Sequence, residues 1–87
     1  MKKIKLTKGE FALVDDEDFD RLSRYKWCFS RYANRNVSEN GKQKGWRMHW
    51  EVMGGKPPKG LEVDHINGDK IDNRKENLRL LHLLKIK

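Results

Sequence analysis

The sequence contains a single cysteine, Cys28, among its 87 residues. One cysteine cannot form a disulfide within the chain, and it excludes a zinc site built from several cysteines. We interpret Cys28 as a small core residue. No apolar run is long enough to cross a membrane, and Met1-Lys2-Lys3 is not followed by a signal-like apolar segment. These absences predict a soluble, intracellular protein without a membrane partner.

Apolar residues are also scarce. They make up 36% of the chain, charged residues make up 38%, and the mean hydropathy is -1.00. Residues 1–87 therefore predict one small domain with a thin core, near the lower limit of what a single core stabilises.

What the chain has in excess is positive charge, with a net charge of +7 and a pI of about 9.7. A basic surface of this strength favours a polyanionic partner, most often a nucleic acid, although a basic domain can also be basic only for solubility. Lysine and arginine occur from Lys2 to Lys87, which indicates a folded basic face and not a single basic tail.

The first half of the chain, residues 1–55, predicts a β-rich basic region. Residues 4–7 and 11–14 predict two short strands around Lys8-Gly9. The acidic run that starts at Asp15 predicts the beginning of a helix, because negative side chains suit the positive end of a helix. A metal site built from the same acids is the weaker alternative.

Residues 27–37 predict a strand, residues 38–41 a turn, and residues 44–52 a returning strand that becomes helical near its end. Basic residues alternate with aromatic ones along this hairpin, which fits a ribbon that contacts DNA. The predicted DNA-contacting residues here are Arg31, Arg35, Lys42, Lys44 and Arg47. The alternative is an aromatic core with a solvated basic face. We interpret His49 as a packing or supporting residue.

The most informative stretch is residues 61–81. It begins with an alternating strand pattern, contains an Asn67-Gly68 pair that favours a tight reversal, and ends on a second apolar run. Hydrolysis of a phosphodiester needs a base to deprotonate water, a carboxylate to hold a divalent cation, and a group that orients the base. His65, Asp64 and Asn77 are the candidates for these three roles.

The run VDHINGDKIDNRKENLRLL resembles the signature of the HNH homing endonucleases, the phage-type ββα-metal nucleases. The segments KLTKGEFALVDDEDF, RYKW and RMHWEVMG resemble the leading region of small members. The resemblance implies double-stranded DNA as the partner, Mg²⁺ or Mn²⁺ as the cofactor, Asp64 as metal ligand, His65 as general base and Asn77 as the residue that orients it. Asn73, Asp69 and Asp72 are assigned to the loop's own hydrogen bonds. Arg74, Lys75 and Arg79 would face phosphate.

The family pattern also implies a second metal ligand near position 86, on a helix that follows the second strand. This chain has Lys85-Ile86-Lys87 there, which predicts a weakened or truncated metal site. The predicted fold is therefore a small α+β domain, with an N-terminal antiparallel β region, one short helix, and an HNH-like ββ(α) element over residues 61–87 whose final helix is stunted.

Two functions follow from this interpretation. The first is a metal-dependent DNA endonuclease, weakened by the missing ligand. The second is a non-catalytic module that binds DNA, or that binds and inhibits another nucleic-acid enzyme. A sequence-specific regulator without a nuclease ancestry is a third and weaker hypothesis. The oligomeric state does not follow from the sequence.

Overall fold

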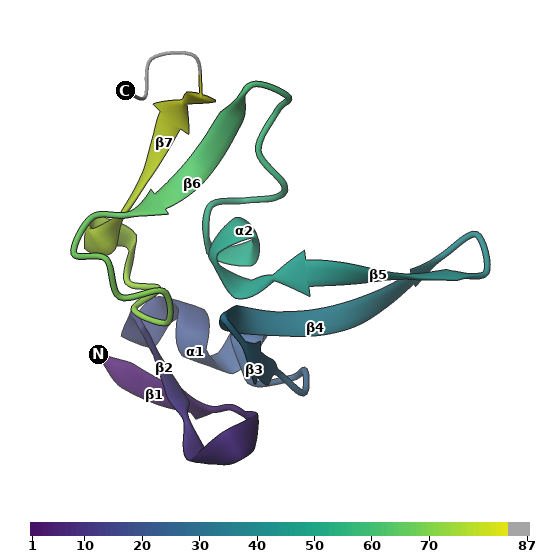
Figure 1. The fold of residues 1–87 in the computed structure, drawn as a ribbon. Helices are drawn as coiled ribbons and strands as arrows, with labels where there is room; N and C mark the ends of the chain where they lie inside the picture. Colours follow the sequence, from purple (N-terminus) through teal and green to yellow (C-terminus); the bar gives the residue numbers. More distant parts are fainter. Residues whose placement is uncertain (84–87) are drawn as a thin grey trace.

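The computed structural model describes residues 1–83. Antiparallel strands and two short helices form a small α+β fold (Figure 1), as the sequence predicts. The closing helix and the position near 86 lie outside the described residues. Neither α1 nor α2, the helices of the described chain, has the length and apolar character that a bilayer crossing requires.

The N-terminal hairpin pairs β1 (Lys2–Lys5) with β2 (Phe11–Val14). Between them lies a 3-10 turn, Thr7–Gly9, in which Lys8 has a φ of 61°. Ile4 of β1 and Val14 of β2 both point into the core and are buried. The predicted strands are confirmed, and the inward face of this hairpin forms one wall of the core.

Helix α1 (Asp16–Leu22) starts where the acidic run predicts it, with Asp15 as the N-cap residue. Its apolar contribution to the core is Leu22, which is completely buried. Trp27 follows and is also buried, with its indole Nε1 donating a 2.7 Å hydrogen bond to the Leu22 carbonyl. This bond satisfies a buried donor and fixes the large Trp27 ring in the middle of the core.

The second sheet has the order β3-β4-β5 and comprises β3 (Cys28–Ser30), β4 (Tyr32–Glu39) and β5 (Lys42–Arg47). The single strand predicted over residues 27–37 is wrong, because Arg31 adopts a φ of 67° and reverses the chain there. β3 therefore pairs antiparallel with β4. The predicted core position of Cys28 is also wrong, because its side chain is exposed.

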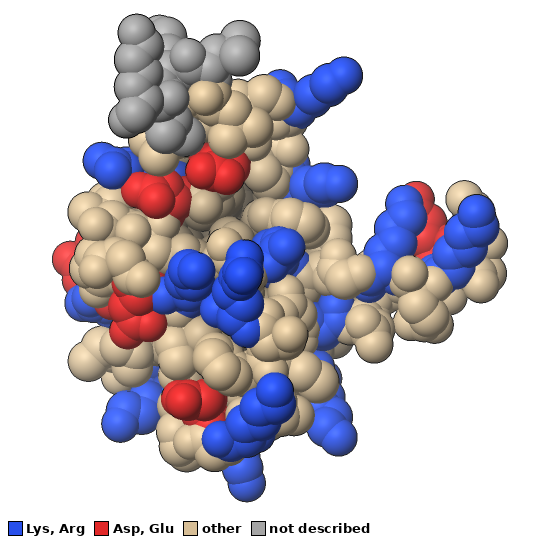
Figure 2. Space-filling model, viewed as in Figure 1, with Lys and Arg blue, Asp and Glu red and all other residues tan. Residues whose placement is uncertain are grey.

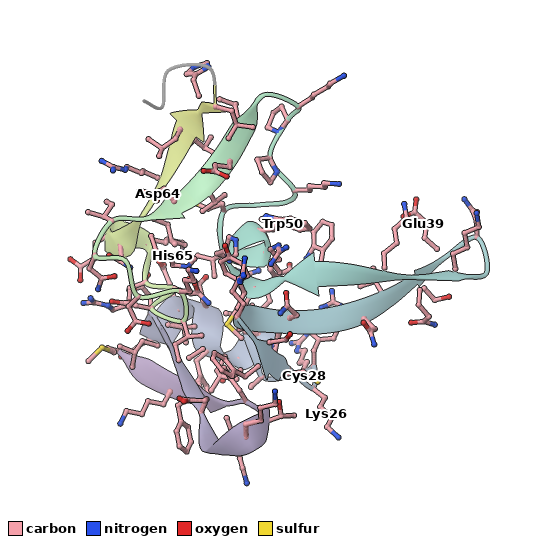
Figure 3. The ribbon with its side chains drawn as sticks, viewed as in Figure 1. Lys26, Cys28, Glu39, Trp50, Asp64 and His65 are labelled. Atoms are coloured by element: carbon pink, nitrogen blue, oxygen red, sulfur yellow. The ribbon has the colours of Figure 1, made fainter. Side chains whose placement is uncertain are left out.

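Strands β4 and β5 form a ribbon that extends away from the rest of the molecule (Figure 1), with Glu39 near its far end (Figure 3). Asn40 and Gly41 both have positive φ, which is the backbone of a two-residue hairpin turn. The returning strand ends at Arg47, earlier than predicted, and α2 (Met48–Val52) begins immediately. Met48 and Val52 bury one face of this helix in the core.

The third sheet pairs β6 (Leu61–His65) with β7 (Leu78–His82). The predicted tight reversal at Asn67-Gly68 is wrong as a connection. Gly68 does make a turn, with its N–H donating to the His65 carbonyl at 2.9 Å, but the chain reaches β7 only after residues 66–77. We call residues 66–77 the site loop. It returns to the N-terminal hairpin, where β2 and the loop exchange hydrogen bonds at Leu13.

Candidate active site

His65 is the last residue of β6, and its side chain is only 7% exposed. Alternation along the strand explains this burial, since Val63 faces the core and His65 follows two positions later on the same face. The ring Nε2 lies 2.8 Å from Oδ1 of Asn73. With Oδ1 as the acceptor, this contact is a hydrogen bond when Nε2 carries the proton, and the lone pair of Nδ1 is then available. Within residues 1–83, Nδ1 has no hydrogen-bond partner.

Asn73 is fully buried and is held by its own backbone, whose N–H donates to the Leu13 carbonyl at 2.8 Å. The residue that orients His65 therefore comes from the site loop, and the N-terminal hairpin fixes its position. The sequence assigned Asn73 to the loop's own hydrogen bonding. The structure corrects that assignment.

The predicted contact between Asn77 and His65 is wrong. Asn77 Oδ1 accepts from the Asn67 backbone N–H at 3.0 Å, and its Nδ2 donates to Asn67 Oδ1 and to the Asp72 carbonyl. Every polar atom of this amide is thus committed to the site loop. Asn77 is buried, and within the described residues its side-chain hydrogen bonds go to Asn67 and Asp72 of the site loop and not to His65.

The other loop carboxylates have structural roles, as predicted. Asp69 Oδ1 accepts a hydrogen bond from the Ile71 backbone N–H, and Asn67 Oδ1 accepts one from the Asp69 backbone N–H. Asp72 is 2% exposed and accepts hydrogen bonds from Asn67 and from the guanidinium of Arg74. The bonds from Arg74 lower the pKa of Asp72 and raise the pKa of Arg74. Arg74 is therefore engaged within the loop and is not free to face phosphate as predicted.

Asp64 precedes His65 and points to the opposite face of β6, where its Oδ2 accepts a 3.0 Å bond from Nε of Arg79 on β7. Asp64 and His65 nevertheless both line one small cavity of about 120 Å³. Figure 3 labels the two residues on β6. Lys70 of the site loop and Tyr32 of β4 line the same cavity. Asp64 and His65, which the sequence predicts to act at one catalytic centre, therefore line the same cavity.

Asp64 provides a donor of the type that a divalent cation prefers. Its side chain is partly exposed, and its Oδ1 has no donor among residues 1–83. Within the same residues, no group of three His, Cys, Asp or Glu ligands surrounds it. The residues therefore fit a hard cation held by one protein carboxylate, with Arg79 competing for the second oxygen.

Two aromatic neighbours complete the surroundings of His65. The His49 ring lies 4.7 Å from the His65 ring, edge to face, and Tyr32 packs against both imidazoles. His49 is 3% exposed, and its buried Nδ1 has no hydrogen-bond partner among residues 1–83. Burial is the main cause that lowers the pKa of His49 to about 3, with smaller contributions from the charges on His65 and Arg47. His49 is therefore neutral at physiological pH and supports His65, which agrees with its predicted supporting role.

The acidic group Asp15, Glu17 and Asp18 at the start of α1 is arranged closely enough to hold a cation. The amine of Lys75 takes that position, 2.7 Å from Glu17 and 3.2 Å from Asp18. These carboxylates raise the pKa of Lys75. Lys75 thus fastens the site loop to α1 and is not free to face phosphate as predicted.

The DNA-contacting residues predicted over residues 31–47 separate into three groups. Arg35 turns inward, with its guanidinium 3.8 Å from the centre of the Tyr25 ring and 3.5 Å from Glu51. Arg31 and Lys42 are exposed, and Lys44 is exposed with a surface ion pair to Glu39. Arg47 lies over the Tyr32 and Trp50 rings near the site.

Basic side chains gather in the middle of the face shown in Figure 2, where β6, α2 and the site loop meet in Figure 1. Arg47 and Lys70 line the cavities in this region. Lys70 is not recognisable from the sequence as a site residue, because its position over the Tyr32 ring depends on the fold.

Comparison with known proteins shows the family to which the chain is similar. Residues 47–82 match the family described as HNH endonuclease. The chain is also 34% identical over 74 residues to a protein of Acanthamoeba polyphaga mimivirus described as uncharacterized HNH endonuclease L560. That alignment covers 84% of this chain and 40% of the viral protein, so the chain spans well under half of its relative. No solved structure matches the chain.

Proposed function

Residues 47–82 place this chain in the HNH endonuclease family, and from that premise we propose that it hydrolyses phosphodiester bonds of double-stranded DNA with His65 as the general base. The observation that carries the proposal is the 2.8 Å contact between Nε2 of His65 and Oδ1 of Asn73. With the Asn73 oxygen as acceptor, Nε2 would carry the proton and Nδ1 would keep its lone pair, and His65 lines a cavity that Asp64 also lines.

In the proposed reaction, Nδ1 of His65 accepts a proton from water while the water oxygen attacks phosphorus. The bond between phosphorus and the leaving oxygen breaks, and that oxygen takes a proton from solvent. Asn73 stabilises the imidazolium that forms, because its carbonyl oxygen accepts the Nε2–H. Tyr32 and His49 hold the ring from the sides and restrict its rotation.

Asp64 would hold the divalent cation, Mg²⁺ or Mn²⁺, through its free carboxylate oxygen. Such an ion, when bound, neutralises charge on the phosphate and on the leaving oxygen. Arg79 shares the Asp64 carboxylate and is itself 54% exposed. Arg79 is thus able to turn toward a phosphate when its carboxylate partner binds a cation.

The ribbon would provide contacts to the DNA backbone away from the cut. Lys42 is exposed on the ribbon, and Lys44 has only a surface ion pair there, which costs little to exchange for a phosphate. Arg31 is exposed at the turn between β3 and β4 and would add a further contact. Arg35, Arg74 and Lys75 are left out of this set because each is engaged within the protein.

The test is a plasmid-nicking assay with Mg²⁺ or Mn²⁺, with EDTA as the negative control. We expect the parent to nick, and His65→Ala and Asp64→Asn to lose nicking. His82→Ala is the matched control, because His82 is an exposed histidine on the paired strand. This variant should nick like the parent.

Equal nicking by the parent and His65→Ala would overturn the assignment of the base. No nicking by the parent, together with retained DNA binding, would favour the second candidate, a non-catalytic binding module. The observation behind that candidate is the Arg79 contact with Asp64, which engages the only carboxylate predicted to hold the metal.

A further inference from the structure

A second and larger cavity of about 560 Å³ adjoins the candidate active site. It lies between α2, the connector that contains Pro57 and Pro58, and β6. Its volume falls within the range of about 300–1,000 Å³ that is usual for small-ligand sites. We call it the lateral groove, and its polar and aromatic lining consists of Tyr32, Arg47, His49, Trp50, Lys56, Lys59 and Glu62.

The lateral groove combines aromatic rings with positive charge. The guanidinium of Arg47 lies 4.4 Å from the centre of the Tyr32 ring and 5.5 Å from that of Trp50. The amine of Lys56 lies 5.6 Å from the Trp50 ring. Within residues 1–83, Arg47, Lys56 and Lys59 form no ion pair. The groove thus presents three cations without acidic partners, against one exposed acid, Glu62.

The groove adjoins the cavity that His65 lines. Tyr32, Glu62 and Val63 line both spaces. His49 lines the groove, and its ring contacts the His65 ring at 4.7 Å. Figure 3 shows Trp50 on the α2 side of this arrangement and His65 at the end of β6. A molecule in the groove would therefore lie directly beside the phosphate that His65 acts on.

We propose that the lateral groove binds one unpaired nucleotide of the substrate strand, next to the scissile phosphate, with its base against Trp50 and its phosphates near Arg47 and Lys56. The inference rests on the proposed nuclease function. A base in a duplex is covered on both faces by its neighbours, so stacking on Trp50 requires a nucleotide that has left the stack. Aromatic rings and cations together recognise such nucleotides without selecting their sequence.

The experiment uses a short oligothymidylate with one 2-aminopurine, whose fluorescence falls when its base stacks. It is added to His65→Ala protein in EDTA, so that binding is measured without cleavage, and polarisation of a terminal dye reports binding separately. We expect quenching when the probe base occupies one position and little quenching elsewhere. In the His65→Ala background, Trp50→Leu should abolish the quenching and weaken binding roughly tenfold, and Trp50→Phe should keep part of both.

Two control sets keep the test independent of folding. Trp46→Phe changes the tryptophan that packs against Trp50 at 5.4 Å but does not line the groove, so quenching should persist. Lys56→Gln with Lys59→Gln should weaken binding and reduce the salt slope by about two. The double control Lys3→Gln with Lys5→Gln removes the same charge from the N-terminal hairpin and should change binding less.

Bound probe without quenching at any position would overturn the inference, as would unchanged quenching in Trp50→Leu or a failure of the probe to bind. These results are separable from the plasmid assay. Nicking without quenching would keep the nuclease and reject the groove. Quenching without nicking would keep the groove as a nucleotide site and reject the nuclease.

Discussion

His65 and Asn73 form the smallest unit on which the proposed chemistry depends. The histidine is buried, and within the described part of the chain its ring pairs with the amide oxygen of Asn73. A neutral imidazole held in this way has a defined tautomer, because only the protonated nitrogen can face the oxygen. The free nitrogen is then always the same atom, which is what a general base requires.

Replacing Asn73 should reduce activity by more than the accompanying loss of stability explains. Asn73→Ala removes the acceptor of Nε2–H, so we expect nicking to fall about 10- to 100-fold. Asn73→Asp keeps an acceptor oxygen and should retain much more activity. Single-turnover nicking at a temperature where both variants are folded provides the measurement. Equal activity of the two variants would show that the acceptor does not orient His65.

His49 should make the protein sensitive to acid. Its pKa of about 3 in the folded protein lies below the unfolded value of 6.5. The unfolded chain therefore binds a proton first as pH falls, and stability that is complete above pH 6.5 is lost toward pH 3. Between pH 7 and pH 5 the loss is about 2 kcal/mol. Urea unfolding at these two pH values should show a smaller loss for His49→Gln than for the parent.

The matched control for this measurement is His82→Gln, because His82 is exposed. Its pH dependence should follow that of the parent. A parent whose free energy of unfolding is the same at both pH values would contradict the buried, neutral state of His49.

Residue chemistry in the sequence located His65 and Asp64, and the alternation of β6 explains why His65 is buried. It did not locate the partner of His65, because Asn73 and Asn77 are the same residue type within one loop. Their roles differ only through backbone contacts, such as the one from Asn73 to Leu13, which is distant in the sequence. No local pattern records such a contact.

At the scale of elements, the site loop is held from two sides. Asn77 and Asp72 organise it from within, and Lys75 fastens it to the start of α1. The loop also exchanges backbone hydrogen bonds with Leu13 of β2. The N-terminal hairpin and helix therefore have a direct role in placing Asn73 against His65.

Asn77→Ala should act through the loop and not through the base. It removes three hydrogen bonds and leaves the Asn67 N–H and the Asp72 carbonyl without their partner. We expect a loss of about 3 kcal/mol in the free energy of unfolding, measured in urea. Nicking should recover at low temperature, where the loop is folded. A folded but inactive Asn77→Ala variant would show that Asn77 acts directly in the reaction. Asn36→Ala serves as the control, because Asn36 is exposed.

Element positions were easier to predict than element partners. Alternation gave β1, β2 and β6, and the acidic run gave the start of α1. The break between β3 and β4 was missed, because it depends on a positive φ at Arg31, and arginine carries no signal for that conformation. Arg74 and Lys75 were misassigned because their carboxylate partners are identified only by the folded loop and by α1.

For the whole molecule, the net charge of +7 is divided between cations that hold the fold together and cations that remain accessible. Arg35 and Lys75 belong to the first group and Lys42 to the second. Net charge alone therefore overstates the number of residues available to DNA. The projecting ribbon and the basic centre of the face in Figure 2 are where accessible charge is concentrated.

Removing charge from the ribbon should weaken DNA binding without affecting the fold. For Lys42→Gln with Lys44→Gln, we expect the slope of log affinity against log salt to decrease by about two. The melting temperature should stay close to that of the parent, because both side chains are exposed. Titrations at several salt concentrations give the slope. An unchanged slope would remove the ribbon from the DNA-binding surface.

The most direct test of the central claim is chemical rescue of the base. In His65→Gly, the imidazole is replaced by a space that free imidazole can enter. We expect that His65→Gly does not nick in the presence of Mg²⁺ or Mn²⁺, and that added imidazole restores nicking in proportion to its neutral form. Asp64→Asn should not respond to imidazole. Nicking by His65→Gly at the rate of the parent, without imidazole, would contradict the claim that His65 is the general base.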